Sequence, residues 1–265
     1  MQQVKKQTLS SIKSSKGKRK LSMITAYDAL FSNLFDGEVD FILVGDSLNM
    51  SFGGNSDTLS ITMENMIYHT KAVCNGSKNT FIICDMPFGT YIDEKTAFKN
   101  AMLVYQQTSA DAIKIEGGKS KAHIVKHLTD SSIAVVGHIG LMPQNVRSEG
   151  GYKIKGKDTQ NIQELIEDAK AIESAGAFCI VLEGVKPEAA KEITQSVDVP
   201  VIGIGAGLDV DGQVLVWSDM LGFFDEFKPK FVRRYLDGAN LVKQSIKKYV
   251  NDVSTEKFPS KDEIY

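Results

Sequence analysis

The stretch NIQELIEDAKAIESAGAFCIVLEGVKPEAAKEITQSVDVPVIGIG, residues 161–205, alternates segments of helical and strand character. Residues 161–176 place apolar side chains at helical spacing and end in a glycine, a common helix stop. The run FCIVLE that follows is almost wholly apolar, as expected for a strand covered on both faces. A second helical segment, 187–197, opens with a proline suited to the first turn, and a second apolar run follows at 199–205. This pattern predicts repeated strand and helix units around a parallel sheet.

The same alternation extends along the rest of the chain. A further helical segment, 93–110, opens with acidic residues that suit a helix N-terminus. Together with a length of 265 residues, the strand count predicts a single (β/α)8 TIM barrel of the α/β class. Eight candidate strands are counted: LSMITAY (21–27), FILVG (41–45), TFIICD (80–85), AIKIE (112–116), IAVVGH (133–138), FCIVLE (178–183), VPVIGIG (199–205) and QVLVW (213–217).

The two ends of the chain are polar. We expect one domain over residues 1–265, with a polar N-terminal extension at 1–20 that forms a peripheral helix and a C-terminal tail at 251–265. The segment 221–250 has enough helical character for two helices, and two are expected there.

Composition narrows the possible partners. The chain has 31 Lys and Arg against 33 Asp and Glu, so it has no broad electrostatic field for nucleic acid or an anionic membrane. A small-molecule partner fits better. With no apolar signal peptide and no membrane-length apolar run, a cytoplasmic location is expected. Cys74, Cys84 and Cys179 are widely spaced, which indicates reduced thiols.

Ionisable side chains follow the apolar runs with unusual regularity. In a barrel of this class the C-terminal strand ends carry the chemistry, so these positions are the candidate site. Any one of them could be a helix cap or a turn residue, but the recurrence at successive strands favours a common function. The residues are Asp46, Asp85, Lys114, Glu116, His138 and Glu183.

Lys114 and Glu116 lie two apart on one predicted strand, so both point to the same side. If the isoleucines between them face the helices, this pair faces the barrel axis. A structural ion pair is one explanation. However, Asp46, Asp85 and Glu116 would converge from three strands and repel one another unless a cation joined them. Hard oxygen ligands of this kind favour Mg²⁺ or Mn²⁺.

Three other features are weaker. His123 and His127 have i,i+4 spacing, but a solvated helix face explains them better than a zinc site. The segment GIGAG (203–207) lacks the full phosphate-loop pattern, so close packing and an anion pocket stay open. The long connection 140–160 is rich in basic residues and is expected to be a lid, with a disordered insertion as the alternative.

Ten sequence blocks together resemble the ketopantoate hydroxymethyltransferase family, and LVGDSL, KIEGG, GHIGL and IGIGAG in this order are the most specific. Two departures stand out: Asn49 replaces a glycine usual in the family, and GGNSDTL (53–59) replaces a segment that commonly reads GHDSTL. The blocks are TAYDALFSNLF (25–35), LVGDSLNM (43–50), TLSITMENMIYHT (58–70), DMPFGTY (85–91), IKIEGG (113–118), GHIGLMPQ (137–144), GGYKIKGK (150–157), VLEGV (181–185), PVIGIGAG (200–207) and DGQVLV (211–216).

The resemblance implies roles for single residues. It implies one magnesium ion per subunit, or manganese or another divalent ion, held by Asp46, Asp85 and Glu116. It implies substrate contacts from Ser47, Lys114 and His138, with Asp46 and Asp85 contributing at the same place. Glu183 matches the proton acceptor of the family.

The resemblance also implies the reaction. A hydroxymethyl group passes from 5,10-methylenetetrahydrofolate to 3-methyl-2-oxobutanoate through a metal-stabilised enolate, which gives 2-dehydropantoate (ketopantoate) and tetrahydrofolate in pantothenate and coenzyme A biosynthesis. A homo-oligomer, a decamer in many members, is implied too. The alternatives are a magnesium-dependent enzyme similar to phosphoenolpyruvate mutase or isocitrate lyase, an aldolase with Lys114 as Schiff-base nucleophile, and a non-catalytic binding barrel.

Overall fold

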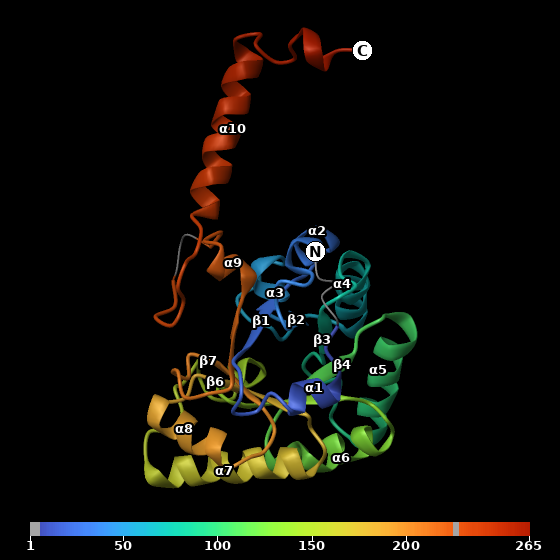
Figure 1. The fold of residues 1–265 in the computed structure, drawn as a ribbon, viewed down its shortest axis with the longest axis vertical. Coiled ribbons are helices and arrows are strands. Elements are labelled where there is room, and N and C mark those ends of the chain that lie inside the picture. Colours follow the sequence, from blue (N-terminus) through green and yellow to red (C-terminus); the bar gives the residue numbers. More distant parts are fainter. Residues whose placement is uncertain (1–5, 225–227) are drawn as a thin grey trace. The chain divides into compact units, whose positions relative to one another are not determined.

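A computed structural model of the chain describes residues 6–224 and 228–265. By its internal contacts the chain divides into two compact units, one ending at Val216 and the other comprising Trp217–Tyr265. Each unit is described by itself below. The first unit holds the strands, which the surrounding helices cover (Figure 1).

The strands form one closed parallel barrel, in which each strand pairs with the next and β8 pairs with β1. The predicted (β/α)8 fold is therefore confirmed. The eight strands are β1 (Leu21–Thr25), β2 (Phe41–Val44), β3 (Phe81–Asp85), β4 (Ala112–Glu116), β5 (Val135–Gly140), β6 (Cys179–Glu183), β7 (Val201–Ile204) and β8 (Gly212–Leu215).

The predicted barrel helices are present as α5, α7 and α8, each within a few residues of its expected bounds. Side-chain caps define their starts: Asp93 accepts a hydrogen bond from Thr96 N, and Asp158 accepts one from Asn161 N. The α-helices are α1 (Leu9–Lys13), α2 (Ala29–Phe35), α3 (Leu48–Ser51), α4 (Met63–Gly76), α5 (Glu94–Gln107), α6 (Ala122–Asp130), α7 (Thr159–Ser174), α8 (Pro187–Gln195), α9 (Trp217–Met220) and α10 (Gly238–Ser254); short 3-10 turns lie at Lys119–Lys121, Pro143–Asn145 and Lys261–Glu263.

The C-terminal region differs from the prediction. The eighth strand ends at Leu215, and Trp217 begins α9. Of the two helices expected in 221–250, the described residues show only α10; residues 225–227 lie outside the described residues. Pro229 is one physical reason, because a proline disfavours helical geometry at the preceding residue and offers no amide hydrogen. The helix α10 extends four residues into the expected tail.

Alternate strand residues fill the barrel interior. Seven inward side chains of β1, β2, β3 and β8 are apolar and buried, and they form one cluster with inward residues of the other strands. The seven are Leu21, Met23, Phe41, Leu43, Phe81, Ile83 and Val214. Ile12 of α1 belongs to this cluster and is fully buried. The predicted N-terminal helix therefore covers the end of the barrel where the strands begin.

A buried carboxylate joins the segments at this N-terminal end of the barrel. Asp211, just before β8, accepts hydrogen bonds from Val201 N at 2.9 Å and Gly17 N at 3.2 Å. Its Oδ2 also lies 2.8 Å from Lys16 Nζ, which donates to the Thr194 carbonyl at 2.7 Å. Asp211 thus connects β7, β8 and the N-terminal segment.

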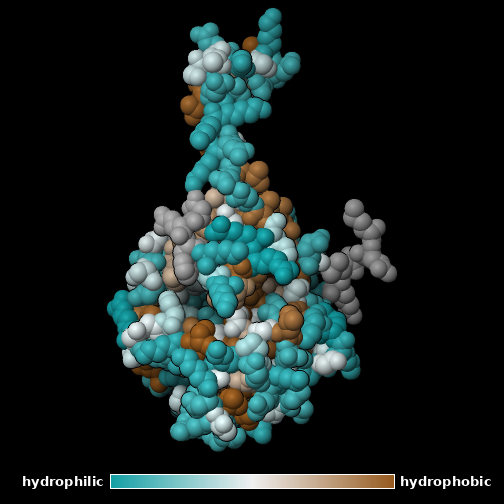
Figure 2. All heavy atoms as spheres, turned by 90° about the vertical axis from the view of Figure 1, so that its left-hand side faces the viewer, coloured by the Kyte–Doolittle hydropathy of each residue, from teal (hydrophilic) through white to brown (hydrophobic). Residues whose placement is uncertain are grey.

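The surface of the barrel unit is largely hydrophilic, with separate hydrophobic patches (Figure 2). Among the described residues no helix is both long enough and apolar enough to cross a membrane. The three cysteines are buried and unpaired, as the sequence predicts for reduced thiols.

Candidate active site

Ionisable side chains occupy the inward positions nearest the C-terminal ends of four strands. Since alternate residues share a side, each lies one layer beyond the apolar cluster. This register places Lys114 and Glu116 on the axis side, as the sequence predicts. The inward rows read Phe81, Ile83 and Asp85 on β3; Ala112, Lys114 and Glu116 on β4; Val136 and His138 on β5; and Cys179, Val181 and Glu183 on β6.

Lys114 lies at the centre of these side chains. Its Nζ is 3.2 Å from Asp85 Oδ1 and 3.0 Å from His138 Nδ1, and all three side chains are buried. Burial alone would lower the pKa of Lys114, but the nearby carboxylates, Asp85 first among them, outweigh it and raise that pKa above its ordinary value. Lys114 is therefore an ammonium ion.

His138 joins two carboxylates. Its Nδ1 is 3.4 Å from Glu116 Oε1, and its Nε2 is 3.3 Å from Glu183 Oε2. Burial and the charge of Lys114 each lower the pKa of His138, but Glu116 and Glu183 outweigh them and raise it to about 9. The Nε2 of His138 therefore faces Glu183, whose side chain is 21 % exposed.

Asp46 follows β2 and completes the group, because its backbone N–H donates to Asp85 Oδ2 at 3.0 Å. Burial, followed by the charges of Asp85 and Glu116, raises the pKa of Asp46 to about 8. Burial also raises the pKa of Asp85, although Lys114 partly opposes this. The three carboxylates therefore cannot all ionise easily at neutral pH unless further positive charge arrives.

Gln144 is a site residue that the sequence reasoning missed. Its Nε2 donates to Asp46 Oδ2 at 2.9 Å and to the Met86 carbonyl at 3.0 Å, and its backbone N–H donates to Glu116 Oε2 at 3.1 Å. The Tyr91 hydroxyl donates to its Oε1. One buried residue thus orients two of the predicted metal ligands, Asp46 through its side chain and Glu116 through its backbone N–H. The available signal was its place at the end of the block GHIGLMPQ.

Ser47 is held by a second residue that the sequence reasoning missed. The hydroxyl of Tyr27 lies 2.8 Å from Ser47 Oγ. Burial raises the pKa of Tyr27 to about 12, so the phenol stays neutral and can donate or accept this hydrogen bond. In turn, His69 Nδ1 lies 2.6 Å from the Tyr27 carbonyl.

The two departures from the family pattern form a single local structure. Asn49 is buried, and its Nδ2 donates to the Asp57 carbonyl at 2.7 Å and to Ser60 Oγ at 2.9 Å. Asn55 Nδ2 donates to Asn49 Oδ1 at 3.1 Å. The asparagine therefore organises the loop that replaces the usual segment, which a glycine could not do.

The long connection between β5 and α7 is ordered by specific contacts. Arg147 donates to Asp57 Oδ2 through two nitrogens, at 3.1 and 2.9 Å, and Lys155 Nζ lies 2.5 Å from Glu149 Oε2. Lys155 also forms a parallel bridge with Val185. These contacts do not fit a disordered insertion. The lid movement stays a prediction.

The donor atoms match the chemistry of a divalent cation. Asp85 Oδ1 and Glu116 Oε1 are buried and accept no hydrogen bond from the described residues, although Lys114 and His138 face them. Yet the described residues contain no group of three or more His, Cys, Asp or Glu side chains arranged to hold a metal ion. Mg²⁺ commonly uses only one or two carboxylates together with water and substrate, so the residues fit this ion.

Comparison with known proteins agrees with this geometry. Residues 5–261 match the family described as ketopantoate hydroxymethyltransferase. The chain belongs to this family. It is 65 % identical over 260 residues to the 3-methyl-2-oxobutanoate hydroxymethyltransferase of Aliarcobacter butzleri, covering 98 % of this chain and 97 % of that protein. It is 60 % identical to the protein of that name from Helicobacter pylori strain P12, covering 99 % of this chain and 97 % of that one. A transferase of this family, as the sequence predicts, is confirmed.

Solved structures share the fold at low identity. A phosphonopyruvate hydrolase in complex with oxalate and Mg²⁺ aligns with a TM-score of 0.62 at 12 % identity, covering 96 % of this chain and 92 % of that one. A 2,3-dimethylmalate lyase of the phosphoenolpyruvate mutase and isocitrate lyase superfamily aligns with a TM-score of 0.63 at 15 % identity, covering 92 % and 88 %. These likenesses concern the barrel fold.

Proposed function

We propose that this chain transfers the one-carbon unit of 5,10-methylenetetrahydrofolate, with water, to C3 of 3-methyl-2-oxobutanoate, giving 2-dehydropantoate and tetrahydrofolate in pantothenate biosynthesis. One arrangement carries the proposal: Lys114, His138 and Glu183 follow one another at 3.0 and 3.3 Å. Forming an enolate needs positive charge beside the oxygen that gains charge and a base beside the carbon that loses a proton. Lys114 and Glu183 supply these groups at opposite ends of the row.

The same residues would hold one divalent metal ion, Mg²⁺ or Mn²⁺, through Asp46, Asp85 and Glu116. Two buried oxygens that accept no hydrogen bond from the described residues, together with the raised pKa of Asp46, support this part of the proposal. When bound, the ion supplies Lewis-acid stabilisation of the negative charge on the substrate oxygens.

The chain's own residues position the oxo acid. Lys114 is held by Asp85 with its ammonium among the carboxylates, where it attracts the substrate's anionic end. Ser47, held by the Tyr27 hydroxyl, would donate a hydrogen bond to the same oxygens. His138 lines the pocket between these groups and the base.

Glu183 would accept the C3 proton. Its Oε2 faces His138 Nε2 at 3.3 Å, so Oε1 is the oxygen that would take the proton. The imidazole would fix the orientation of the carboxylate, as second residues do for many catalytic bases. Water would release the one-carbon unit at the aldehyde level, breaking both of its bonds to folate nitrogens, which keep the two protons of water as tetrahydrofolate. The enolate carbon would then add to the aldehyde carbon, and the oxygen that came from water would take the proton held by Glu183.

A Schiff-base aldolase would need Lys114 as a neutral amine. The ion pair with Asp85 at 3.2 Å and the raised pKa of Lys114 both favour the ammonium form. Borohydride should therefore trap no adduct at Lys114 in the presence of the oxo acid.

The decisive experiment measures deuterium exchange at C3 of 3-methyl-2-oxobutanoate in Glu183→Gln, with Glu188→Gln on the exposed start of α8 as the matched control. Exchange should fall by roughly 10²- to 10⁴-fold in the first variant and remain in the second. Metal-dependent binding of the oxo acid should persist in both.

Retained exchange in Glu183→Gln removes that residue from the base role. In the unaltered protein, chelation should abolish turnover with methylenetetrahydrofolate, and Mg²⁺ should restore it. Full turnover in metal-free protein contradicts the metal part of the proposal.

The chain would act as one barrel domain in the cytoplasm, as part of a homo-oligomer. Its three unpaired cysteines suit a reducing compartment. On α10, Val242, Ile246, Val250 and Val253 recur at helical spacing and are 47–57 % exposed. An exposed apolar stripe of this kind supports association with other copies of the chain. The family resemblance implies a decamer, so light scattering should give the mass of ten chains.

A further inference from the structure

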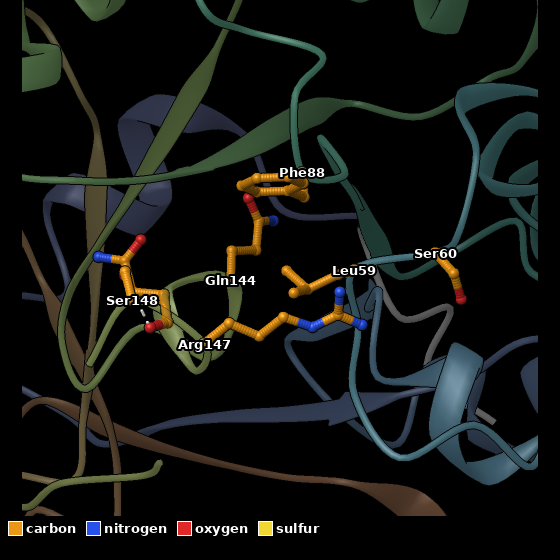
Figure 3. A pocket seen from close by; sticks show the side chains of 7 residues that line it. Leu59, Ser60, Phe88, Gln144, Arg147 and Ser148 are labelled. Carbon is orange, nitrogen blue, oxygen red and sulfur yellow. Dashed lines mark hydrogen bonds between the residues drawn. The ribbon is translucent and has the colours of Figure 1, made fainter. Parts of the chain in front are cut away.

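A pocket beside the acidic group has no part in the steps above. Its volume is about 390 Å³, within the size range of small-molecule sites. Leu59, Phe88, Gln144 and Arg147 line it, from the connections that follow β2, β3 and β5 (Figure 3). All three connections lie at the C-terminal end of the barrel, where the predicted site residues gather.

The walls of the pocket suit a flat ring. Phe88 is 54 % exposed, and in the view of Figure 3 its ring and the extended side chain of Arg147 lie on opposite sides, with the Gln144 and Leu59 side chains between them. Arg147 is 74 % exposed, yet its guanidinium is fixed by two hydrogen bonds to Asp57, at 3.1 and 2.9 Å. An aromatic face opposite a held guanidinium is a surface on which a planar heteroaromatic ring stacks.

The pocket is also in the right place for a one-carbon donor. Gln144 lines it, and the same side chain donates to Asp46 Oδ2 at 2.9 Å. The pocket and the acidic group are therefore separated by a single carboxamide. The oxo acid is small and has no ring, so it would leave the surface of Phe88 uncovered.

We infer that this pocket receives the reduced pterin of the folate co-substrate, with its planar pyrimidinone half stacked on the exposed ring of Phe88, Arg147 at the opposite wall, and the one-carbon unit toward Asp46. The inference rests on the proposed function. Asn145 and Ser148 add a carboxamide and a hydroxyl to the pocket lining, which match the amide edge of a pterin.

The test compares Phe88→Ala with Ile92→Ala. Ile92 is 66 % exposed on the same β3–α5 connection but does not line the pocket, so it controls for the loss of an exposed apolar side chain. Binding is titrated with tetrahydrofolate and with a tetrahydropterin that lacks the aminobenzoylglutamate tail. Phe88→Ala should weaken both by about tenfold, and Ile92→Ala should weaken neither.

Two further measurements test whether the aromatic ring of Phe88 makes the contact and whether the Phe88→Ala variant is folded. Phe88→Tyr keeps the ring and should bind both ligands within about threefold of the unaltered protein, because stacking is retained. Deuterium exchange at C3, which needs no folate, should persist in Phe88→Ala and show that the variant is folded.

Tetrahydrofolate affinity within twofold of the unaltered protein in Phe88→Ala overturns the inference. So does a loss confined to tetrahydrofolate, because the tail and not the ring would then contact Phe88. If the unaltered protein neither binds tetrahydrofolate nor exchanges C3, the proposed function itself fails, and that result differs from a failure confined to the variant.

Discussion

The buried carboxylates at the two ends of the barrel differ in their hydrogen bonds and in their charged partners. At the N-terminal end, both oxygens of Asp211 accept hydrogen bonds, and Lys16 neutralises its charge at 2.8 Å. At the C-terminal end, Asp85 Oδ1 and Glu116 Oε1 accept no hydrogen bond from the described residues, and burial, followed by the charges of Asp85 and Glu116, raises the pKa of Asp46 to about 8.

The difference separates stability from function. A buried carboxylate with all its hydrogen bonds made stabilises the segments that it joins. Buried carboxylates that repel one another cost stability, and they persist where a ligand relieves the repulsion. In a barrel of this class the C-terminal end is the place for ligands, and the N-terminal end is the place for structure.

The largest expected effect is a loss of activity on changing a carboxylate at the C-terminal end of the barrel. Asp85→Asn should lower kcat/KM by about 10³-fold, or about 4 kcal/mol, because it removes a predicted metal ligand and the partner of Lys114. The melting temperature should change little or rise, since one of several mutually repelling charges is removed. Steady-state kinetics and calorimetry measure the two effects. Strong destabilisation with retained kcat would place Asp85 in the same class as Asp211.

Asp211→Asn should give the reverse result. Its Nδ2 group would face Val201 N–H or Gly17 N–H, and Lys16 would lose its ionic partner. A loss of about 3 kcal/mol in the free energy of unfolding is expected, with kcat per folded molecule unchanged. Denaturant titration gives the first quantity and active-site titration the second. Unchanged stability with lost turnover would show that Asp211 serves activity and not stability.

A smaller effect is expected at Asp36, which follows α2 and binds the segment before β3 through Thr80 N at 2.9 Å. Burial would raise its pKa, but hydrogen bonds led by that from Ser77, with Asn79 contributing as well, lower it from 3.8 to about 2. A lowered folded-state pKa gives stability that is present above about pH 4 and lost as pH falls towards 2. Because Asp36 is only partly buried, solvent screening limits this contribution to on the order of 1 kcal/mol.

The measurement compares the unaltered protein with Asp36→Asn by denaturant titration between pH 6 and pH 3. The difference in unfolding free energy should narrow at the acidic end of this range. A difference that stays constant with pH would mean that packing, and not the charge of Asp36, accounts for its effect.

Much of the fold could be predicted from the chain alone. Continuous apolar runs and helical periodicity have strong signals, so all eight strands were found, each within two residues at each end. The eighth strand was predicted to end two residues too late, because a short apolar run such as QVLVW does not show where strand pairing stops. Trp217 continues the apolar pattern but belongs to a helix.

The candidate site was predicted in part. Asp85, Glu116 and Glu183 end their strands, Lys114 lies two residues before the end of β4, and the period of two along a strand assigns their side. Gln144 and Tyr27 were missed because an uncharged side chain after a strand has no distinctive pattern. Their roles come from hydrogen bonds to residues 98 and 20 positions away.

The sequence by itself determined the barrel, the family and the row of ionisable residues, because periodicity and local motifs are properties of neighbouring residues. Only the tertiary structure decided which of those residues meet. Strand register brings Lys114 to Asp85 and His138 to Glu183, and the connection after β5 brings Gln144 to Asp46. Barrel closure also decided that both oxygens of Asp211 accept hydrogen bonds, whereas Asp85 Oδ1 and Glu116 Oε1 at the other end accept none from the described residues. Burial and hydrogen-bond partners depend on contacts between segments that are distant in the sequence.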